Sequence, residues 1–335
     1  MGCIYSIKEN RDPMKGVVKI WADAVFEGGG IKGIGLVGAL CVAESKGYRW
    51  KKIAGTSAGS MIAALLAAGF KADELYELLI KQNFMDFVTP HWYDKIPYLV
   101  PSTRLWFKKG MHSGHALEKW LEDKLAEKGV RTFGDLEGKT ELQIIASDIS
   151  RSRLLVLPED LVQYGIEPKQ FSIARVVRMS SSIPFFYEPV KLMHQASKSY
   201  SYIVDGAMLS NFPVWIFDRP EPRWPTFGFR LGGGSSETVR AIRNPFSMLR
   251  SIFFTMMDAH DNRYIIGNEE IRTIQVPPLH IRLTDFDLSV EDKEKLFQSG
   301  VKAGEKFFDN WDYNIYLKVR ELKQQVQVQI RAQKK

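Results

Sequence analysis

The sequence predicts an α/β protein with a mostly parallel central sheet. Between residues 17 and 70, a strand, a glycine-rich loop, a helix, a second strand, a serine-containing turn and a second helix follow one another. This alternation is typical of parallel strands covered by helices. Apolar residues fill 45% of the 335 positions, which is enough for a sizeable buried core.

The predicted elements can be placed in order along the chain. Strands are expected at residues 17–26, 52–54, 142–146, 153–157, 200–204, 226–231 and 280–283, where apolar and β-branched residues gather. Helices are expected at 34–46, 61–70, 113–128, 172–179, 245–264 and 290–311. Residues 312–335 are polar and basic and are expected to form a helical tail.

Charge and composition limit the classes of function. The formal net charge of +7 favours anionic partners such as a phospholipid surface, but the basic residues are scattered, so no nucleic-acid partner is predicted. No apolar run approaches the ~20 residues of a membrane span, and the N-terminus lacks the apolar region of a secretory signal. Two cysteines, Cys3 and Cys41, are too few for a disulfide framework, and Cys41 is expected in the core. We therefore predict a cytoplasmic protein, with peripheral membrane contact left open.

The turn at residues 55–59 is the first candidate for chemistry. It reads Gly55-Thr56-Ser57-Ala58-Gly59, a G-x-S-x-G pattern between a strand and a helix. In this context the pattern predicts a nucleophile elbow, which exposes a serine hydroxyl at the helix N-terminus. Glycines on either side remove Cβ atoms from a crowded turn. The alternative is an ordinary Gly/Ser turn.

The glycine loop after the first strand has several interpretations. Gly28, Gly30 and Gly33 match a dinucleotide-binding fingerprint, but no acidic residue ends the second strand to bind a ribose. A phosphate-binding loop with Gly-Lys-Ser/Thr is absent. Three consecutive glycines, Gly28, Gly29 and Gly30, can instead aim backbone N–H groups into one concavity, as in an oxyanion hole. A simple tight turn explains one glycine well and four in six residues poorly.

A carboxylate follows a late apolar run. Asp205 and Gly206 come directly after residues 200–204, which predict a strand. Asp-Gly is also a favoured turn dipeptide, so from these residues alone a turn is the better interpretation. The general base of a hydrolase is the alternative.

Together these stretches resemble the patatin-like phospholipase family, the serine–aspartate acyl hydrolases. The resemblance spans roughly residues 23–217 and is carried by five segments in matching order: Gly28–Gly33, Gly55–Gly59, Ser180–Phe186 with Pro189-Val190, Asp205–Ala207 and Asn211–Val214. Three positions depart from the family pattern: Glu27, Lys32 and Ala207 stand where Asp, Arg and Gly are common.

The resemblance implies a three-layer α/β/α patatin-like fold and a lipid acyl hydrolase of the phospholipase A or esterase type. It makes Ser57 the nucleophile and Asp205 the general base, with backbone amides around Gly28, Gly29 and Gly30 as the oxyanion hole. No metal or cofactor is implied, and the substrate would be a phospholipid or another acyl lipid. Five residues would support the motifs: Lys32, Gly33, Gly55, Gly59 and Gly206.

Alternative functions remain at this stage. A Ser-His-Asp esterase would recruit His194, His260 or His280 after Ser57. A non-catalytic lipid-binding protein could keep the fold without turnover, and the glycine loop leaves a nucleotide-binding protein as a further alternative.

The domain organisation is predicted as one catalytic domain with two extensions. Residues 1–16 form an N-terminal extension in which Gly2 and Cys3 fit a lipidation pattern or a coincidence. Residues 17–320 form the patatin-like domain, with an aromatic-rich insertion near 84–112, and residues 321–335 are the basic tail. The insertion either contacts lipid or packs against the domain. The acidic residues near 285–292 lack calcium-loop spacing, and no oligomeric state is predicted.

Overall fold

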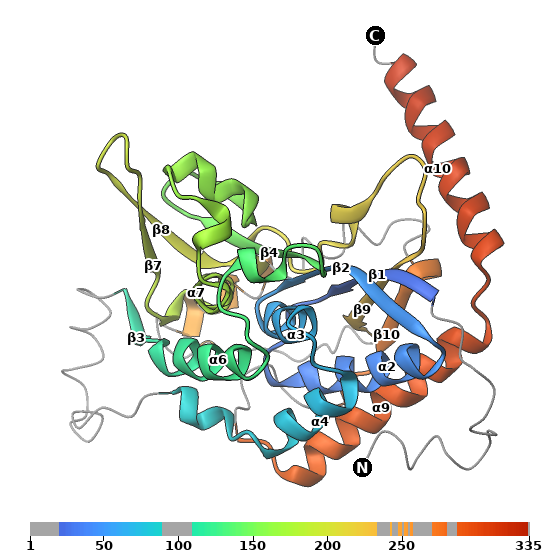
Figure 1. Cartoon of the computed structure of the whole chain (residues 1–335), viewed down its shortest axis with the longest axis horizontal. Coiled ribbons are helices and arrows are strands. Elements are labelled where there is room, and N and C mark those ends of the chain that lie inside the picture. Colours follow the sequence, from blue (N-terminus) through green and yellow to red (C-terminus); the bar gives the residue numbers. More distant parts are fainter. Residues whose placement is uncertain are drawn as a thin grey trace.

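A computed structural model describes residues 20–88, 109–232, 270–279 and 287–333, with short stretches between 242 and 256. Its centre is an eight-stranded sheet with the order β10-β9-β1-β2-β4-β8-β7, in which β5 also pairs with β4 (Figure 1). The strands are β1 (Ile20–Phe26), β2 (Tyr48–Thr56), β4 (Glu141–Asp148), β5 (Arg153–Leu157), β7 (Val190–Met193), β8 (Tyr200–Asp205), β9 (Thr226–Leu231) and β10 (Thr273–Val276).

The sheet is parallel from β10 to β4 and antiparallel beyond it. The pairs β10–β9, β9–β1, β1–β2 and β2–β4 are parallel. Both β5 and β8 run antiparallel to β4, and β7 runs antiparallel to β8. A second, two-stranded sheet joins β3 (Gly110–His112) to β6 (Phe185–Tyr187). The parallel strands bring several carboxyl ends to one edge, where loop residues can form a site.

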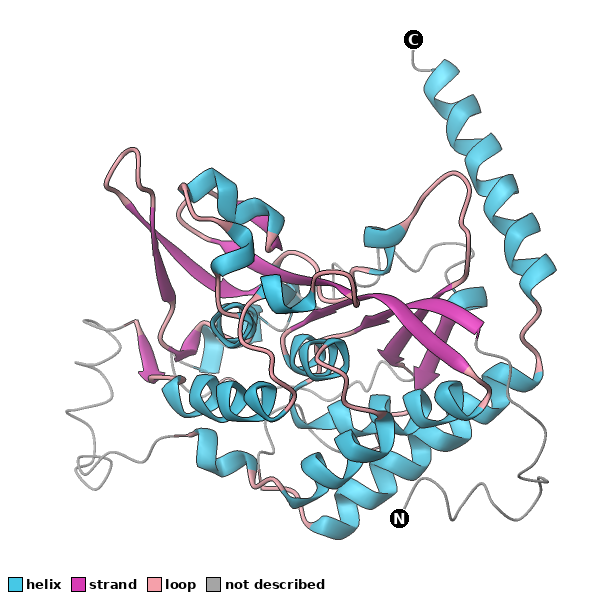
Figure 2. Ribbon diagram, viewed as in Figure 1, coloured by secondary structure: helices cyan, strands magenta, loops and turns pink. Residues whose placement is uncertain are grey.

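Helices lie against this sheet in two unequal layers (Figures 1 and 2). Ala24 and Phe26 of β1 join the large core that the helices cover, whereas Val25 packs on the opposite face with Phe212 and Val214. The 3-10 helix Val214–Phe217 contributes Val214 and Phe217 to this second face. The helices are α2 (Gly33–Ser45), α3 (Ala58–Ala67), α4 (Ala72–Lys81), α6 (His115–Glu127), α7 (Ile173–Ser180), α9 (Val290–Asp309) and α10 (Tyr313–Gln333).

The α/β class with a mostly parallel central sheet is confirmed, and most described elements lie within a few residues of their predicted bounds. The second strand is longer than predicted, because it begins at Tyr48 rather than Lys52. Among the described helices and strands, five were not predicted: α4, β3, β6, β7 and β10. The helical spacing of Leu75 and Leu79, both buried in α4, was a signal for the first of them.

Several predicted segments lie outside the described residues. These are the N-terminal extension with Gly2 and Cys3, residues 89–108 of the aromatic insertion, most of the helix at 245–264, and the strand at 280–283. At the start of the insertion, Phe84 and Phe87 are buried, and the Phe87 ring packs against Trp120 with centroids 5.3 Å apart. This first part of the insertion is therefore core.

Cys41 is buried on α2, as predicted.

Helices α2 and α9 cross at very close range because glycines line the contact. A Cβ atom on Gly300 would clash with the carbonyl oxygen of Gly35, and one on Gly38 would clash with that of Phe297. The two helix backbones are in direct contact here, so rotating a side chain could not relieve such a clash. This contact clamps α9 onto the helix that follows the glycine loop.

We expect Gly300→Ala to lower the free energy of unfolding by about 1–3 kcal/mol, through overpacking at this crossing. Urea unfolding followed by circular dichroism would measure the loss. Lys302→Ala, at an exposed position of the same helix, should change stability by less than ~0.5 kcal/mol. Equal stability of the two variants would contradict the close packing of α2 and α9.

Candidate active site

The turn between β2 and α3 holds Ser57 in a strained conformation. Ser57 has φ = 52° and ψ = −127°, in the left-handed half of backbone space that non-glycine residues rarely adopt. A Cβ atom on Gly55 would clash with the carbonyl oxygen of Gly59, and one on Gly59 would clash with that of Phe26. The two glycines therefore let α3 approach β1 and β2, and this sharp turn has the form of the predicted elbow.

The side chain of Asp205 lies directly against Ser57. The Ser57 hydroxyl donates to Asp205 Oδ2 at 2.7 Å, although the two residues are 148 positions apart. Asp205 ends β8, and its Oδ1 atom accepts the Ala207 amide at 2.9 Å. A Cβ atom on Gly206 would clash with the Ile145 carbonyl oxygen, so glycine is required where the chain passes β4. The structure thus joins the two side chains that the sequence analysis selected.

Burial changes the acidity of this carboxyl group. Asp205 is 1% exposed and Ser57 is 8% exposed. Desolvation raises the pKa of Asp205 from 3.8 to about 7, although the hydrogen bonds from Ser57 and the Ala207 amide lower it. A carboxylate with a pKa near neutrality is a much stronger base than an exposed aspartate and is still ionised in part at pH 7.

Two serines near the end of α7 hold the backbones of this pair. Ser180 Oγ accepts the Ser57 amide at 2.8 Å and donates to the Ile145 carbonyl at 2.6 Å. The Ser182 carbonyl accepts the Asp205 amide at 2.9 Å. In the sequence these serines belong to one motif, but no local pattern indicates their task, because their partners are distant in the sequence.

The glycine loop lies beside Ser57. A Cβ atom on Gly28 would lie 3.1 Å from the Ser57 Cβ and would clash with the Asn211 side chain. The Gly28 amide donates to the Asn211 carbonyl at 3.1 Å, so this amide is already bonded. Gly30 has φ = 58°, which favours glycine. The loop is in the predicted place, but Gly28 anchors it and does not offer its amide to a ligand.

A buried carboxylate ties the same loop to β9. Glu27 is 4% exposed and accepts hydrogen bonds from the Leu231 amide at 2.6 Å and from Arg230 Nε at 3.1 Å. A Cβ atom on Gly29 would clash with the Leu231 side chain. Lys32 is half-buried in the short helix Gly30–Lys32, and Gly33 begins α2, where an added Cβ would lie 3.2 Å from Ile62. These contacts place both motif residues in the scaffold of the loop.

Histidine is not the partner of Ser57 among the residues that the structure describes. His194 is buried after β7, where it contacts Ser201 Oγ at 3.1 Å and packs on the Tyr164 ring. Ser201 is four residues before Asp205 on an extended strand, or about 13 Å away. His260 and His280 lie outside the described residues. In the same described part, no group of three or more His, Cys, Asp and Glu side chains could hold a metal ion.

The length and apolar character of the helices bear on membrane insertion. Within the described ranges, none combines the length and the apolar character that crossing a bilayer requires.

The fold and the site define an α/β protein whose serine elbow meets a buried aspartate beside a glycine loop. The model of the family described as patatin-like phospholipase matches residues 24–218. The chain belongs to this family, as the resemblance of its motifs implied, and lipid hydrolase activity is the function that the family supports.

Individual proteins and solved structures are similar to this chain. Protein YqhO of Bacillus subtilis (strain 168), which is uncharacterized, is 40% identical over 296 residues, covering 88% of this chain and 100% of the relative. A probable lipid hydrolase of Invertebrate iridescent virus 6 is 27% identical over 203 residues, covering 59% of this chain and 63% of the relative. Among solved structures, VipD from Legionella pneumophila has a TM-score of 0.49 at 16% identity, covering 91% of this chain and 72% of that one.

Proposed function

We propose that the protein hydrolyses acyl esters of lipids through an acyl-Ser57 intermediate, with Asp205 as the general base. The observation that carries this proposal is the 2.7 Å hydrogen bond from the Ser57 hydroxyl to the buried Asp205 carboxylate. A serine hydroxyl is a weak nucleophile until a base takes its proton, and here the base is already in contact.

In the acylation step, Ser57 Oγ attacks the carbonyl carbon of the ester while its proton passes to Asp205. The C–O bond to the leaving alcohol then breaks, and Asp205 returns the proton to that alcohol. In the deacylation step a water molecule attacks the acyl carbon and Asp205 accepts its proton. The bond from the acyl carbon to Ser57 Oγ then breaks, Asp205 returns the proton to Oγ, and the fatty acid leaves. One aspartate serves both steps, so no histidine relay is needed.

Backbone amides would stabilise the oxyanion. Because the Gly28 amide is bonded to Asn211, we assign this task to the amides of Gly29 and Gly30. The Ala58 amide, in the first turn of α3, is a further donor, because the N-terminal amides of a helix lack intrahelical acceptors. One such donor is typically worth about 3 kcal/mol of transition-state stabilisation.

The substrate class follows from the family and from the viral lipid hydrolase among the relatives. We infer that the acyl group comes from a phospholipid or a similar lipid, reached by transient contact with a membrane surface. The net charge of +7 supports attraction to an anionic surface.

Labelling with a fluorophosphonate probe tests the proposed function. The probe phosphonylates an activated serine, and peptide mass spectrometry locates the modified residue. We expect labelling of Ser57 in the native protein and its loss after heat denaturation. A probe that reacts at another serine, or with no residue of the folded protein, would overturn the proposal.

We expect kcat/KM for a soluble short-chain ester to rise with pH and to level off above about pH 7. Asp205 accepts a proton only when ionised, and burial raises its pKa to about 7. Initial rates measured between about pH 5 and pH 9 would define this curve. A rate already maximal at pH 5 would show that a group of lower pKa is the base.

A further inference from the structure

The last turn of α7, together with the two residues that follow it, contacts the backbones of both proposed catalytic residues. Ser180 Oγ accepts the Ser57 amide, and the Ser182 carbonyl accepts the Asp205 amide. Any movement of this turn would change the separation of the Ser57 hydroxyl and the Asp205 carboxylate. What holds the turn in place therefore affects the reaction, although it touches neither reacting side chain.

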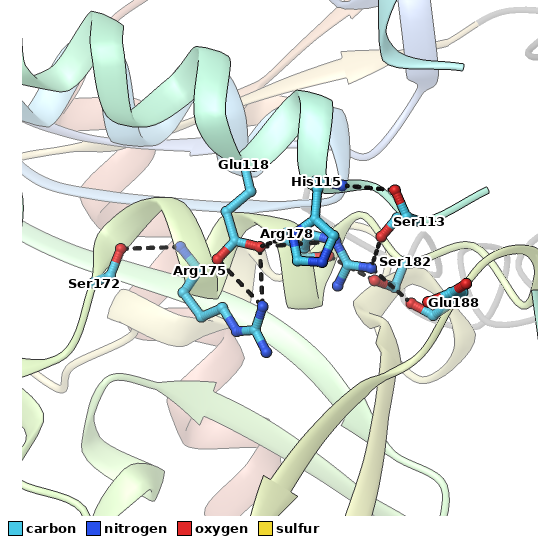
Figure 3. Close-up of polar contacts among 8 residues, drawn as sticks. All are labelled: Ser113, His115, Glu118, Ser172, Arg175, Arg178, Ser182 and Glu188. Atoms are coloured by element: carbon cyan, nitrogen blue, oxygen red, sulfur yellow. Dashed lines mark hydrogen bonds and ion pairs between the residues drawn. The ribbon is translucent and has the colours of Figure 1, made fainter. Parts of the chain in front are cut away.

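Arg178, in the same turn, connects it to two other segments of the chain. Its side chain is 5% exposed. Its Nη2 atom donates to the Ser113 carbonyl and, at 3.1 Å, to the Glu188 carbonyl (Figure 3). Its own carbonyl accepts the Ser182 hydroxyl at 2.7 Å. One buried residue thus links the segment before α6, the segment after β6 and the turn that holds the catalytic pair.

The segments that Arg178 binds are themselves joined. Strands β3 and β6 pair in the small sheet, and the Glu188 amide donates to the His112 carbonyl at 2.8 Å. Gly114 follows with φ = 67°, and a Cβ atom there would clash with the Arg178 guanidinium. The chain therefore leaves β3 with a glycine that gives the arginine room. The guanidinium fastens this sheet to the end of α7.

The charges around Arg178 fit this task. Glu118 of α6 lies 3.9 Å from Arg178 Nε and 3.0 Å from Arg175 Nη1 (Figure 3). Burial lowers the pKa of Arg178, whereas the charge of Glu118 raises it. Burying a cation costs free energy that an apolar side chain would not, so burial alone does not account for an arginine here. The planar guanidinium offers several donors in fixed directions, which can hold two carbonyl groups at once.

We propose that Arg178 is a positioning residue for the Ser57–Asp205 pair, because it anchors the end of α7 to the β3–β6 sheet. The inference rests on the proposed function, since it assigns Arg178 a task in that reaction.

Two variants on different elements test the anchor. Arg178→Lys keeps the charge but loses the fork of donors, and Gly114→Ala pushes a methyl group against the guanidinium. We expect each to lower kcat for a soluble ester and the fluorophosphonate labelling rate by about 10- to 100-fold, with KM changed less than about threefold. The double variant should be little worse than either single variant, because both break the same contact.

Arg175→Gln is the matched control. Arg175 lies on the same helix and binds the same Glu118, but its side chain is 32% exposed. We expect this variant to keep the native kcat, with a small fall in melting temperature at most. A purely structural role of Arg178 would lower the melting temperature without changing kcat in either test variant.

A second readout does not need catalysis. Carbon NMR of the Asp205 carboxyl group should give a titration midpoint near 7 in the native protein, and a lower one in Arg178→Lys, because a loosened site admits water. A change in kcat or in this midpoint that Arg175→Gln does not share supports the anchor. Native values of both in Arg178→Lys and Gly114→Ala would overturn it. Absence of fluorophosphonate labelling in the native protein would instead refute the proposed function. The titration midpoint of Asp205 would then still show whether Arg178 positions the Ser57–Asp205 pair.

Discussion

Replacing Ser57 with alanine is expected to lower ester hydrolysis by roughly 10⁴- to 10⁶-fold, the range for loss of a serine nucleophile. The substitution removes the only atom that could form the acyl-enzyme in this mechanism and leaves the backbone amides in place. It also removes the hydrogen bond that lowers the pKa of Asp205, so the carboxyl group should be more often protonated at neutral pH. Initial rates with a chromogenic short-chain ester would measure the loss.

The control for this experiment is an exposed serine. Ser197 lies between β7 and β8, away from the elbow, and Ser197→Ala should keep the native rate. Thermal melting of both variants would establish that they are folded. If Ser57→Ala retained more than about one hundredth of the native rate, another nucleophile or directly activated water would have to carry the reaction.

The parts of the site that depend on local backbone geometry could be predicted from the sequence. A serine between two glycines, after a strand and before a helix, adopts a sharp turn because of sterics within a few residues, and Ser57 has the expected strained φ. The opening alternation of strands and helices likewise predicted the parallel sheet. For Asp205, the residues alone favoured a turn, and only the family resemblance pointed to the base.

Other features arise from contacts between distant segments, and no local pattern reports them. The Gly28 amide is bonded to the Asn211 carbonyl, which the glycine count did not indicate. Ser180 and Arg178 lie in an ordinary amphipathic helix, yet their partners come from the turn after β2, from β4 and from the segment before α6. A four-residue strand such as β10 is defined by its pairing with β9 rather than by its own composition.

Burial of Asp205 makes it a stronger base but lowers the stability of the folded protein. The pKa of Asp205 is about 7 in the folded protein, whereas 3.8 is the ordinary value that applies in the unfolded chain. Between these two pH values the unfolded chain therefore loses a proton that the folded chain keeps. Stability therefore falls as pH rises through this interval, and the full cost is present above pH 7. The burial that makes Asp205 a useful base therefore also destabilises the fold. The hydrogen bonds from Ser180 and Ser182 and the close packing at Gly55, Gly59 and Gly206 must offset this cost.

Asp205→Asn should separate these two effects. We expect ester hydrolysis to fall by roughly 10³- to 10⁴-fold, because an amide of the same shape cannot accept the proton of Ser57. The Asn oxygen can still accept the Ala207 amide, and its NH₂ group would then donate to Ser57 Oγ and occupy a lone pair of the nucleophile.

The same variant should be more stable than the native protein at pH 8, by an upper limit of roughly 4 kcal/mol, since it buries no charge. The difference should shrink as the pH is lowered toward 4, where Asp205 is neutral in the folded protein. Urea unfolding at both pH values, beside ester kinetics, would measure the two effects on one sample. An inactive variant that is less stable at both pH values would mean that Asp205 acts through structure; an inactive variant that gains stability only at pH 8 would identify a buried, charged base.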